Sequence, residues 1–502
     1  MKKAKQKPNH ILFILIFILN FCIFGQTTTN VLTSFSSNSD YNAYMNFAVN
    51  NTHFIDNNEQ GNIFVVFVDS IKQLTIMTRD NGNWYTQVVA TASPSIIFKN
   101  PNVYWKQGKL HVSWFELASG NTIIKYAKGT PSSTGLYNWN INTFANIPLN
   151  APKYLALSLP DSTYSPIIGF TEAGDTKARM FVSTGESNIS PLTSENPDWE
   201  RSSDISIASD SNVVVVVWEE HWNVPSPDSR LLFTMSNDGG NSWLPIQNLF
   251  NTEQTSIVGD PSIVIADTMI YVAFHGNIGP SVSHIRVARK FPSMSQFELL
   301  NFGTTDSGVV GKGWLPNIDA CDKNPNKLVV SWERTDSAYF DKWQHRVAVA
   351  YISDATLPNS TLNLGPETSS LSTDTSRYDL NSNIIISPDG QIASWVWINI
   401  HELTSDSDIV MTLYFQEVTL NCLLTSEEET YNKNSKIRIY PNPTSDELRF
   451  SSPQSCISIF NTQGVLMSEY QNETMLVSVK NLPLGLYFVK TNTGFGKFIK
   501  IE

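Results

Sequence analysis

A pattern of four short strands, about 50 residues long, recurs seven times between residues 27 and 424 of this 502-residue chain. This region has almost no helical periodicity, and its turns are rich in Gly, Asp and Asn. One such sheet cannot bury both of its faces, whereas sheets packed around an axis cover one another. The sequence therefore predicts an all-β fold, with a seven-bladed β-propeller followed by a small β-sandwich-like C-terminal domain.

The second strand of each repeat is strongly apolar and carries an aromatic residue near its end, as in NVVVVVWEE at 212–220 and KLVVSWER at 327–334. The spacing of these aromatic residues, 47 to 63 residues, fits one four-stranded unit per repeat. The aligned aromatic residues are Phe67, Trp114, Phe170, Trp218, Phe274, Trp332 and Trp395.

First and third strands flank these second strands at matching offsets. DISIASD at 204–210 and PSIVIAD at 261–267 are first strands, and RLLFTMS at 230–236 is an alternating third strand. Two β-sandwiches would also give short strands at regular spacing. The repetition of the whole pattern favours the propeller, with six or eight blades as alternatives.

Composition and charge narrow the class of protein. Hydrophobic residues make up 41% and charged residues 16% of the chain, which fits a large core. The net charge of −12 disfavours binding to nucleic acid. Outside the N-terminal segment, Cys321, Cys422 and Cys456 lack the spacing of a zinc site or a disulfide framework, and SDSD at 405–408 lacks the spacing of an EF-hand. We therefore expect no cofactor and no bound metal.

Residues 1–25 have the pattern of a signal peptide. Four lysines between residues 2 and 7 precede an apolar run at 11–24 that is shorter than a membrane span. We expect cleavage near Gly25 and no transmembrane segment in the mature chain. An uncleaved anchor and a lipoprotein site at Cys22 are the alternatives.

The segment SNDGGNSW at 236–243 lies between a third strand and the predicted fourth strand LPIQNL. Asp238 can accept hydrogen bonds from the turn, and Trp243 can fold beneath it. Ser236, Asp238, Gly240 and Trp243 fit S-x-D-x-G-x-x-W, so the segment resembles the Asp-box (BNR repeat) of sialidase-like propellers, with a shorter echo at 78–84. In that family the box is structural and lies away from the ligand face, so the resemblance implies a fold and not a catalytic Asp238.

A polar linker is predicted at 425–435, and residues 436–502 alternate strands with Gly, Pro and Asn turns. Tyr440, Pro441, Asn442 and Pro443, with Gly485 and Tyr487 in LPLGLYFVK, resemble the C-terminal sorting domain of type IX secretion cargo from the Bacteroidetes. This resemblance implies the type IX secretion machinery as a partner and a product that is secreted or attached to the outer-membrane surface. An unrelated adhesion-like β-domain is the alternative.

Polar and aromatic residues gather just past the aligned aromatic residues. In a propeller, the loops there share one face with the links between blades, and ligands usually bind on that face. Trp stacks on sugar rings, while carboxylates and His bind hydroxyls or transfer protons. A solvated rim, with the tryptophans packed between blades, is the alternative. The catalytic candidates are Glu116, Glu219, Glu220, Glu333 and Arg334, and the ligand-binding candidates are His221, Trp222, His275, Trp314, Trp343, His345, His401 and Glu402.

Two functions fit these residues: binding of extracellular glycans or proteins, and glycoside hydrolysis. Sialidase-like enzymes use three converging arginines, a Tyr/Glu pair and an Asp. Arg179, Arg286 and Arg346 open third strands, but no Tyr/Glu pair can be assigned. We therefore expect a binding role, with a sialidase-like exo-glycosidase as the alternative. Hydrolysis would need two carboxylates about 5–10 Å apart on the loop face, or three arginines meeting a Tyr–Glu pair.

Overall fold

The computed structural model of the chain divides into two compact units, Met1–Thr425 and Ser426–Glu502. Among the described residues, there is no helix with the length and hydropathy needed to cross a membrane. The described residues are 29–38, 53–69, 73–118, 120–133, 135–147, 154–161, 165–172, 179–183, 189–191, 199–222, 229–250, 258–277, 283–292, 294–302, 309–335, 345–356, 360, 362–365, 377–402, 408–420, 439–454, 457–461, 466–470, 474–491 and 494–501.

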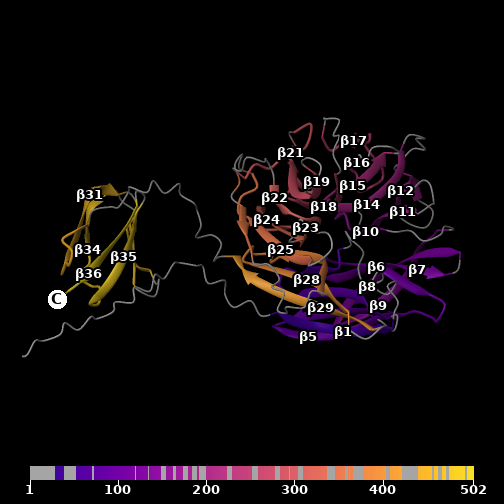
Figure 1. Cartoon of the computed structure of the whole chain (residues 1–502), viewed down its shortest axis with the longest axis horizontal. Coiled ribbons are helices and arrows are strands. Elements are labelled where there is room, and N and C mark those ends of the chain that lie inside the picture. Colours follow the sequence, from indigo (N-terminus) through magenta and orange to yellow (C-terminus); the bar gives the residue numbers. More distant parts are fainter. Residues whose placement is uncertain are drawn as a thin grey trace, which may run out of the picture. The chain divides into compact units, whose positions relative to one another are not determined.

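Five antiparallel sheets follow one another along the first unit, and each contains a meander of four successive strands (Figure 1). The fifth sheet has an extra strand, β22 (Val309–Lys312), which pairs with β20. The strands of the five meanders are β2 (Ile55–Asn57), β3 (Ile63–Val68), β4 (Gln73–Asp80) and β5 (Asn83–Thr91); β6 (Ile97–Lys106), β7 (Lys109–Ala118), β8 (Asn121–Ser133) and β9 (Leu136–Ile147); β10 (Leu155–Ser158), β11 (Ile167–Glu172), β12 (Arg179–Ser183) and β13 (Ile189–Pro191); β14 (Trp199–Asp210), β15 (Val213–Trp222), β16 (Ser229–Ser236) and β17 (Gln247–Asn248); and β18 (Val258–Ala266), β19 (Met269–Asn277), β20 (Ser283–Lys290) and β21 (Glu298–Leu299).

An eight-stranded sheet completes the first unit, in the order β1-β29-β28-β27-β25-β24-β23, with β26 paired to β25. A single parallel residue pair within the described residues, His345 with Tyr378, joins β25 to β27. The N-terminal strand β1 pairs with β29 and so joins the start of the unit to its end (Figure 1). The strands of this sheet are β1 (Asn30–Asn38), β23 (Trp314–Cys321), β24 (Asn324–Thr335), β25 (His345–Ile352), β26 (Leu362–Leu364), β27 (Arg377–Ile386), β28 (Ile392–Glu402) and β29 (Asp408–Thr419).

The first strands of these meanders contact one another in a ring, in the order β2, β6, β10, β14, β18, β23, β27 and back to β2. Polar side chains tie neighbouring first strands together. Ser206 Oγ accepts a hydrogen bond from the N–H of Ile263 at 3.1 Å, and Asn317 Oδ1 accepts one from Ile384 at 3.0 Å. Between β27 and β2, Asn57 Nδ2 donates to the carbonyl of Ile386 at 2.7 Å. The ring is therefore held by hydrogen bonds as well as by apolar packing.

The same irregularity recurs in these first strands. In five first strands, the register of pairing with the second strand shifts beside a residue that has positive φ. Asn and Asp adopt positive φ more readily than other non-glycine residues. Leu315, with φ of 53°, is the strained member of this set. The five residues are Asn100, Asp204, Asp260, Leu315 and Asn381.

The aligned aromatic residues of the second strands are all buried in the core. Trp114, Trp218 and Trp395 are completely inaccessible to solvent. The register corrects one position of the alignment. In the last repeat Trp397, and not Trp395, lies opposite the strand irregularity, because Leu380 pairs with Ile398 and Asn383 with Val396. The two tryptophans lie two positions apart on one strand, so the sequence pattern could not distinguish them.

The second unit contains two antiparallel sheets, β30-β31-β34 and β33-β32-β35-β36. Tyr487 lies in its core, stacks on Phe498 with ring centroids 5.3 Å apart, and donates a hydrogen bond to the carbonyl of Pro483 at 2.7 Å. The strands are β30 (Ile439–Tyr440), β31 (Glu447–Gln454), β32 (Ile457–Phe460), β33 (Leu466–Tyr470), β34 (Thr474–Ser478), β35 (Gly485–Thr491) and β36 (Gly494–Lys500).

Asn442 of the Tyr-Pro-Asn-Pro motif has a structural role in the second unit. Its side-chain amide lies along β36, an end strand of its sheet, donating to the carbonyl of Lys497 at 2.9 Å and accepting from the N–H of Ile499 at 3.0 Å. The peptide bonds before Pro441 and Pro443 are both cis. The Asn442 side chain thus forms hydrogen bonds that a neighbouring strand would otherwise form with β36. It covers a strand edge that could pair with another chain.

Candidate functional site

The two ends of the fourth sheet differ in chemistry. The hairpin at Ser211 and Asn212 marks one end, and Gly239 N–H donates to the carbonyl of Asn212 at 2.9 Å, which places the segment at 236–243 at that end. Strand β15 runs from there towards Glu219 and Trp222 at the other end. We call these the hairpin end and the loop end of the sheets.

At the hairpin end, the carboxylate of Asp238 is engaged by its own turn. Its Oδ1 accepts hydrogen bonds from Ser236 Oγ at 2.7 Å and from the N–H of Ser242 at 2.8 Å. Hydrogen bonds from Ser242 and Ser236 lower the pKa of Asp238 to about 2. The N–H of Gly240 donates to Ser236 Oγ at 2.8 Å, and Trp243 packs against the core. Asp238 therefore stabilises a turn.

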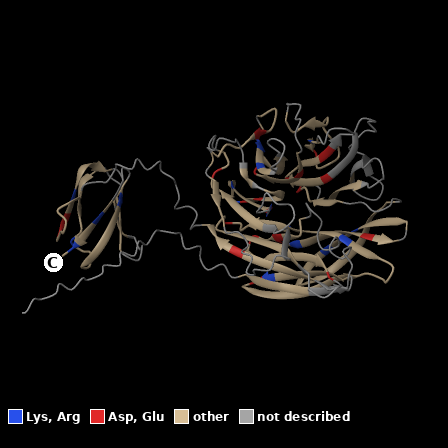
Figure 2. Cartoon of the chain, viewed as in Figure 1, with Lys and Arg blue, Asp and Glu red and all other residues tan. Residues whose placement is uncertain are grey.

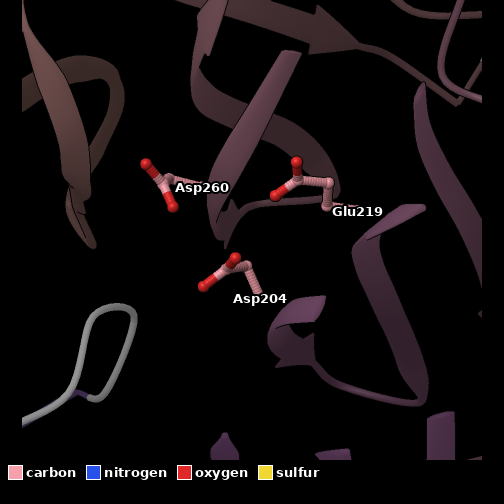
Figure 3. Close-up of side chains that lie close together, drawn as sticks. All are labelled: Asp204, Glu219 and Asp260. Carbon is pink, nitrogen blue, oxygen red and sulfur yellow. The ribbon is translucent and has the colours of Figure 1, made fainter. Parts of the chain in front are cut away.

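At the loop end, three carboxylates from three strands lie together. One oxygen of each of Asp204 (β14), Glu219 (β15) and Asp260 (β18) lies within 4.8 Å of the other two. Figure 3 shows the three carboxylate groups close together. Asp204 and Glu219 are only 5% and 4% exposed. We call these three residues the carboxylate cluster.

Local backbone geometry explains how the cluster forms. Asp204 and Asp260 have φ of 46° and 49° at the irregularities of β14 and β18, so they occupy equivalent positions in two neighbouring sheets. Glu219 follows the buried Trp218 and lies against Gly259. A Cβ at Gly259 would come within 2.6 Å of Glu219 Oε2. Glycine at this position leaves the space that the Glu219 carboxylate occupies beside the backbone.

His275 and Tyr154 border the carboxylate cluster. His275 Nδ1 lies 2.9 Å from Asp260 Oδ2. Burial alone would lower the pKa of His275, but the hydrogen bond and charge of Asp260, with the charge of Glu219, raise it above its usual value. Tyr154 is hydrogen-bonded to Asp204, and burial together with the nearby carboxylates raises the pKa of its hydroxyl strongly.

This arrangement concentrates negative charge in a poorly solvated place. A protonated His275 compensates part of this charge through its contact with Asp260. Carboxylate oxygens are the ligands that Ca²⁺ takes, and they also accept hydrogen bonds from sugar hydroxyls. The sequence alone predicted no metal, because SDSD at 405–408 lacks the spacing of an EF-hand and the cysteines lack that of a zinc site.

The other catalytic candidates do not join the cluster through any contact described here. Glu220 forms an ion pair with Arg230 at 2.8 Å, and Glu116 lies 3.7 Å from Lys125 Nζ. Glu333 is buried and accepts a hydrogen bond from the N–H of Asn381 at 2.6 Å. Arg334 pairs in register with Arg346 on the neighbouring strand.

The ligand-binding candidates divide into two groups. His275 borders the cluster, and Trp314 begins β23, where it pairs in register with Glu333. Trp343 and the side chains of the rest lie outside the described residues, as do those of Arg179 and Arg346. The candidates whose side chains are not described are His221, Trp222, His345, His401 and Glu402.

Sequence reasoning missed Asp204, Asp260 and Tyr154. All three occupy the same position in the first strand of their repeat. The residue two positions further along that strand pairs with the residue just before the aligned aromatic residue of the second strand. An alignment of the first strands by this position would have placed two acids and a tyrosine side by side in successive repeats.

Figure 2 shows that Lys and Arg residues of the described chain are scattered singly among the strands. No continuous basic face runs along the strands drawn there.

Comparisons with solved structures give similarities at low identity. The alpha-L-arabinanase of Penicillium chrysogenum, solved with arabinobiose, is 10% identical over 76% of this chain and 98% of its own, with a TM-score of 0.38. The endosialidase of phage phi92 is 10% identical over 88% and 74%, with a TM-score of 0.44. The GH93 alpha-L-arabinofuranosidase of Fusarium graminearum is 10% identical over 76% and 97%, with a TM-score of 0.37. These TM-scores are all below 0.5.

No curated protein matches the chain by sequence. Residues 438–501 match the family described as secretion system C-terminal sorting domain. This match covers the two sheets of the second unit and includes Asn442 and Tyr487. It supports export of the chain and a secreted or cell-surface location. The C-terminal unit is therefore the sorting domain of the type IX secretion system.

Proposed function

We propose that the first unit of this exported chain binds extracellular glycans at the loop end of its fourth and fifth sheets. The observation that carries this proposal is the carboxylate cluster with His275 and Tyr154 beside it. Buried carboxylates accept directed hydrogen bonds from hydroxyl groups, and a tyrosine or histidine can accept or donate another. Such a set suits a ligand with many hydroxyls on a rigid ring.

The proposal includes a seven-bladed propeller over residues 27–424, preceded by a signal peptide at 1–25. Two features support this blade number. The eight-stranded sheet behaves as two four-stranded meanders because one parallel pair joins them, and the first strands of the meanders make a closed ring of contacts. The hairpin geometry around Asp238 supports the Asp-box assignment, and the polar segment at 425–435 is the proposed linker.

A glycoside hydrolase is the second candidate function. The hydrogen bond of Tyr154 to Asp204, within a group that also contains Glu219, favours it. A tyrosine beside a carboxylate can act as a nucleophile with a base. Hydrolysis makes the stricter demand, because a scissile bond must reach two catalytic groups, whereas binding needs only hydrogen bonds to the cluster.

The test is a glycan array probed with the full chain and with two variants. Glu219→Gln removes a charge from the cluster at nearly constant shape, and Asp238→Asn makes the same kind of change at the hairpin end. We expect wild type and Asp238→Asn to bind the same glycans, and Glu219→Gln to lose at least about tenfold in affinity. Equal binding by all three would refute the assignment of the site.

Three further measurements separate the alternatives. A panel of fluorogenic glycosides, sialosides included, tests hydrolysis, and turnover that Tyr154→Phe abolishes would replace binding with catalysis. A rise of Tm on addition of CaCl₂ that Glu219→Gln abolishes would assign the cluster to a cation. Binding to no glycan while the chain captures a cell-surface protein would replace the glycan by a protein ligand.

A further inference from the structure

A second polar site lies at the hairpin end of the ring of first strands. A cavity of about 240 Å³ is lined by residues of the first strands of successive sheets. We call it the axial cavity. Asp56, Tyr104 and Asp319 line its interior, and Glu59, Trp105 and Asp322 line it where the hairpins meet solvent. None of these residues was among the candidates from the sequence.

Negative charge dominates the wall of this cavity. Four carboxylates line it, from Asp56, Glu59, Asp319 and Asp322, and the lysine in the lining, Lys106, is held by Asp161 at 2.6 Å. Glu59 and Asp322 are exposed, so a ligand can reach them from solvent. The net charge of the lining excludes anionic ligands and favours cationic ones.

The aromatic residues of the cavity wall place a second requirement on the ligand. The ring of Tyr104 stacks on His53 with centroids 4.3 Å apart, and the ring of Trp105 stacks on Phe64 at 5.2 Å while its Nε1 donates to Glu59 Oε2 at 3.0 Å. Both rings are thereby fixed in orientation. Fixed aromatic rings beside carboxylates suit an organic cation, because methylene groups pack on the rings and ammonium groups bind the acids.

A metal ion fits this cavity less well. Within the described residues, the group of three acids or histidines close enough to share an ion is Asp204, Glu219 and Asp260, at the other end of the sheets. The oxygens of Asp56 and Asp319 accept hydrogen bonds from backbone N–H groups of neighbouring strands, Asp319 from Ile386 at 2.8 Å. The acids are therefore spread around a volume larger than one ion.

We propose that the axial cavity binds a small organic cation, of the class of linear diamines and polyamines. The ammonium groups contact Glu59 and Asp322 at the mouth and the acids within, and the carbon chain lies against Tyr104 and Trp105. The acids of this site lie towards the hairpin end, whereas the proposed glycan site lies at the loop end.

The protonation of Asp319 gives the binding a pH dependence. Burial raises the pKa of Asp319 to about 7, although hydrogen bonds from Ile386 and Ala320 and the charge of His53 oppose the rise. The other charged or titratable groups that face it are Asp56, Tyr104 and Asp322. A cation in the cavity favours the ionised carboxylate, so affinity rises as the pH increases through 7.

The experiment is calorimetric titration of the full chain with 1,4-diaminobutane, and with 1,4-butanediol as the neutral analogue of the same shape. We expect saturable one-to-one binding of the diamine and none of the diol. Glu59→Gln and Asp322→Asn should each lower the affinity for the diamine by about tenfold. Asp267→Asn removes one exposed charge from a hairpin at the same end and should leave affinity unchanged.

Four results would overturn the proposal. They are the absence of saturable diamine binding, equal binding of the diol, equal weakening by Asp267→Asn, and competition by CaCl₂ at a lower concentration than the diamine. Since Glu59 and Asp322 are exposed, both variants should melt within about 2 °C of wild type, which separates loss of binding from loss of fold.

Discussion

The two ends of the fourth sheet use the same chemical group in opposite ways. At the hairpin end, Asp238 accepts hydrogen bonds from Ser236 and Ser242 within its own turn. At the loop end, Asp204, Glu219 and Asp260 come from three strands of two sheets and face one another. The carboxylate of Asp238 is satisfied by its own turn and serves the fold, whereas we propose that the carboxylates brought together at the loop end serve a ligand.

The largest expected effect tests the packing beneath the two ends. Trp218 is completely buried under the carboxylate cluster, whereas Trp243 at the hairpin end is only partly buried. We expect Trp218→Ala to lower the free energy of unfolding by about 3–5 kcal/mol and Trp243→Ala by clearly less. Thermal unfolding followed by circular dichroism measures both. Equal losses would mean that both ends depend on core packing to the same degree.

The next effect concerns the close approach of Glu219 to the backbone. In Gly259→Ala the new Cβ would lie 2.6 Å from Glu219 Oε2, so the carboxylate must move. We expect a loss of about 1–3 kcal/mol in stability and a loss of glycan binding. Gly276→Ala is the matched control in the same sheet, because its Cβ would meet Val258 only at 3.3 Å. If Gly276→Ala loses as much glycan binding, displacement of Glu219 is not the cause of the loss in Gly259→Ala.

A smaller effect appears in the pH dependence of the loop end. The pKa of His275 is raised in the folded chain, mainly because Asp260 outweighs burial. Its charged form therefore stabilises the fold below the unfolded pKa of about 6.5, and this contribution is lost as the pH rises through the folded pKa. We expect the Tm difference between wild type and His275→Gln to shrink as the pH increases above 7. A difference that grows with pH would contradict the pairing with Asp260.

The smallest effect, of opposite sign in pH, belongs to the hairpin end. The pKa of Asp238 is lowered to about 2, so its stabilising contribution is present above the unfolded pKa and disappears as the pH falls towards 2. We expect wild type and Asp238→Asn to differ in Tm at pH 5 and to converge near pH 2. Persistence of the full difference at pH 2 would show that shape, and not charge, matters in this turn.

Local patterns in the sequence predicted much of the fold. Each predicted second strand overlaps a strand in the structure, as 212–220 does with β15, because an apolar run that ends in an aromatic residue is a local signal. Strand β1 was missed because its partner β29 lies nearly 380 residues away. Nothing in the sequence of β1 itself indicates that pairing.

The candidate site was predicted only in part for a similar reason. Glu219 and His275 were found because each directly follows an aligned aromatic residue. Asp204 and Asp260 reach the cluster through a residue with positive φ that shifts the register of the strand. That shift is a property of strand pairing, and hydrophobic alternation does not encode it.

The most direct test of the contrast between the two ends is the Tm of Glu219→Gln and Asp238→Asn, measured side by side at pH 7 without ligand. We predict a rise for Glu219→Gln, on the order of 1 kcal/mol in the free energy of unfolding, because it relieves repulsion among three buried carboxylates. We predict a fall for Asp238→Asn, because its turn loses charged hydrogen bonds. A fall in both variants would contradict the claim that the loop-end carboxylates are held for a ligand.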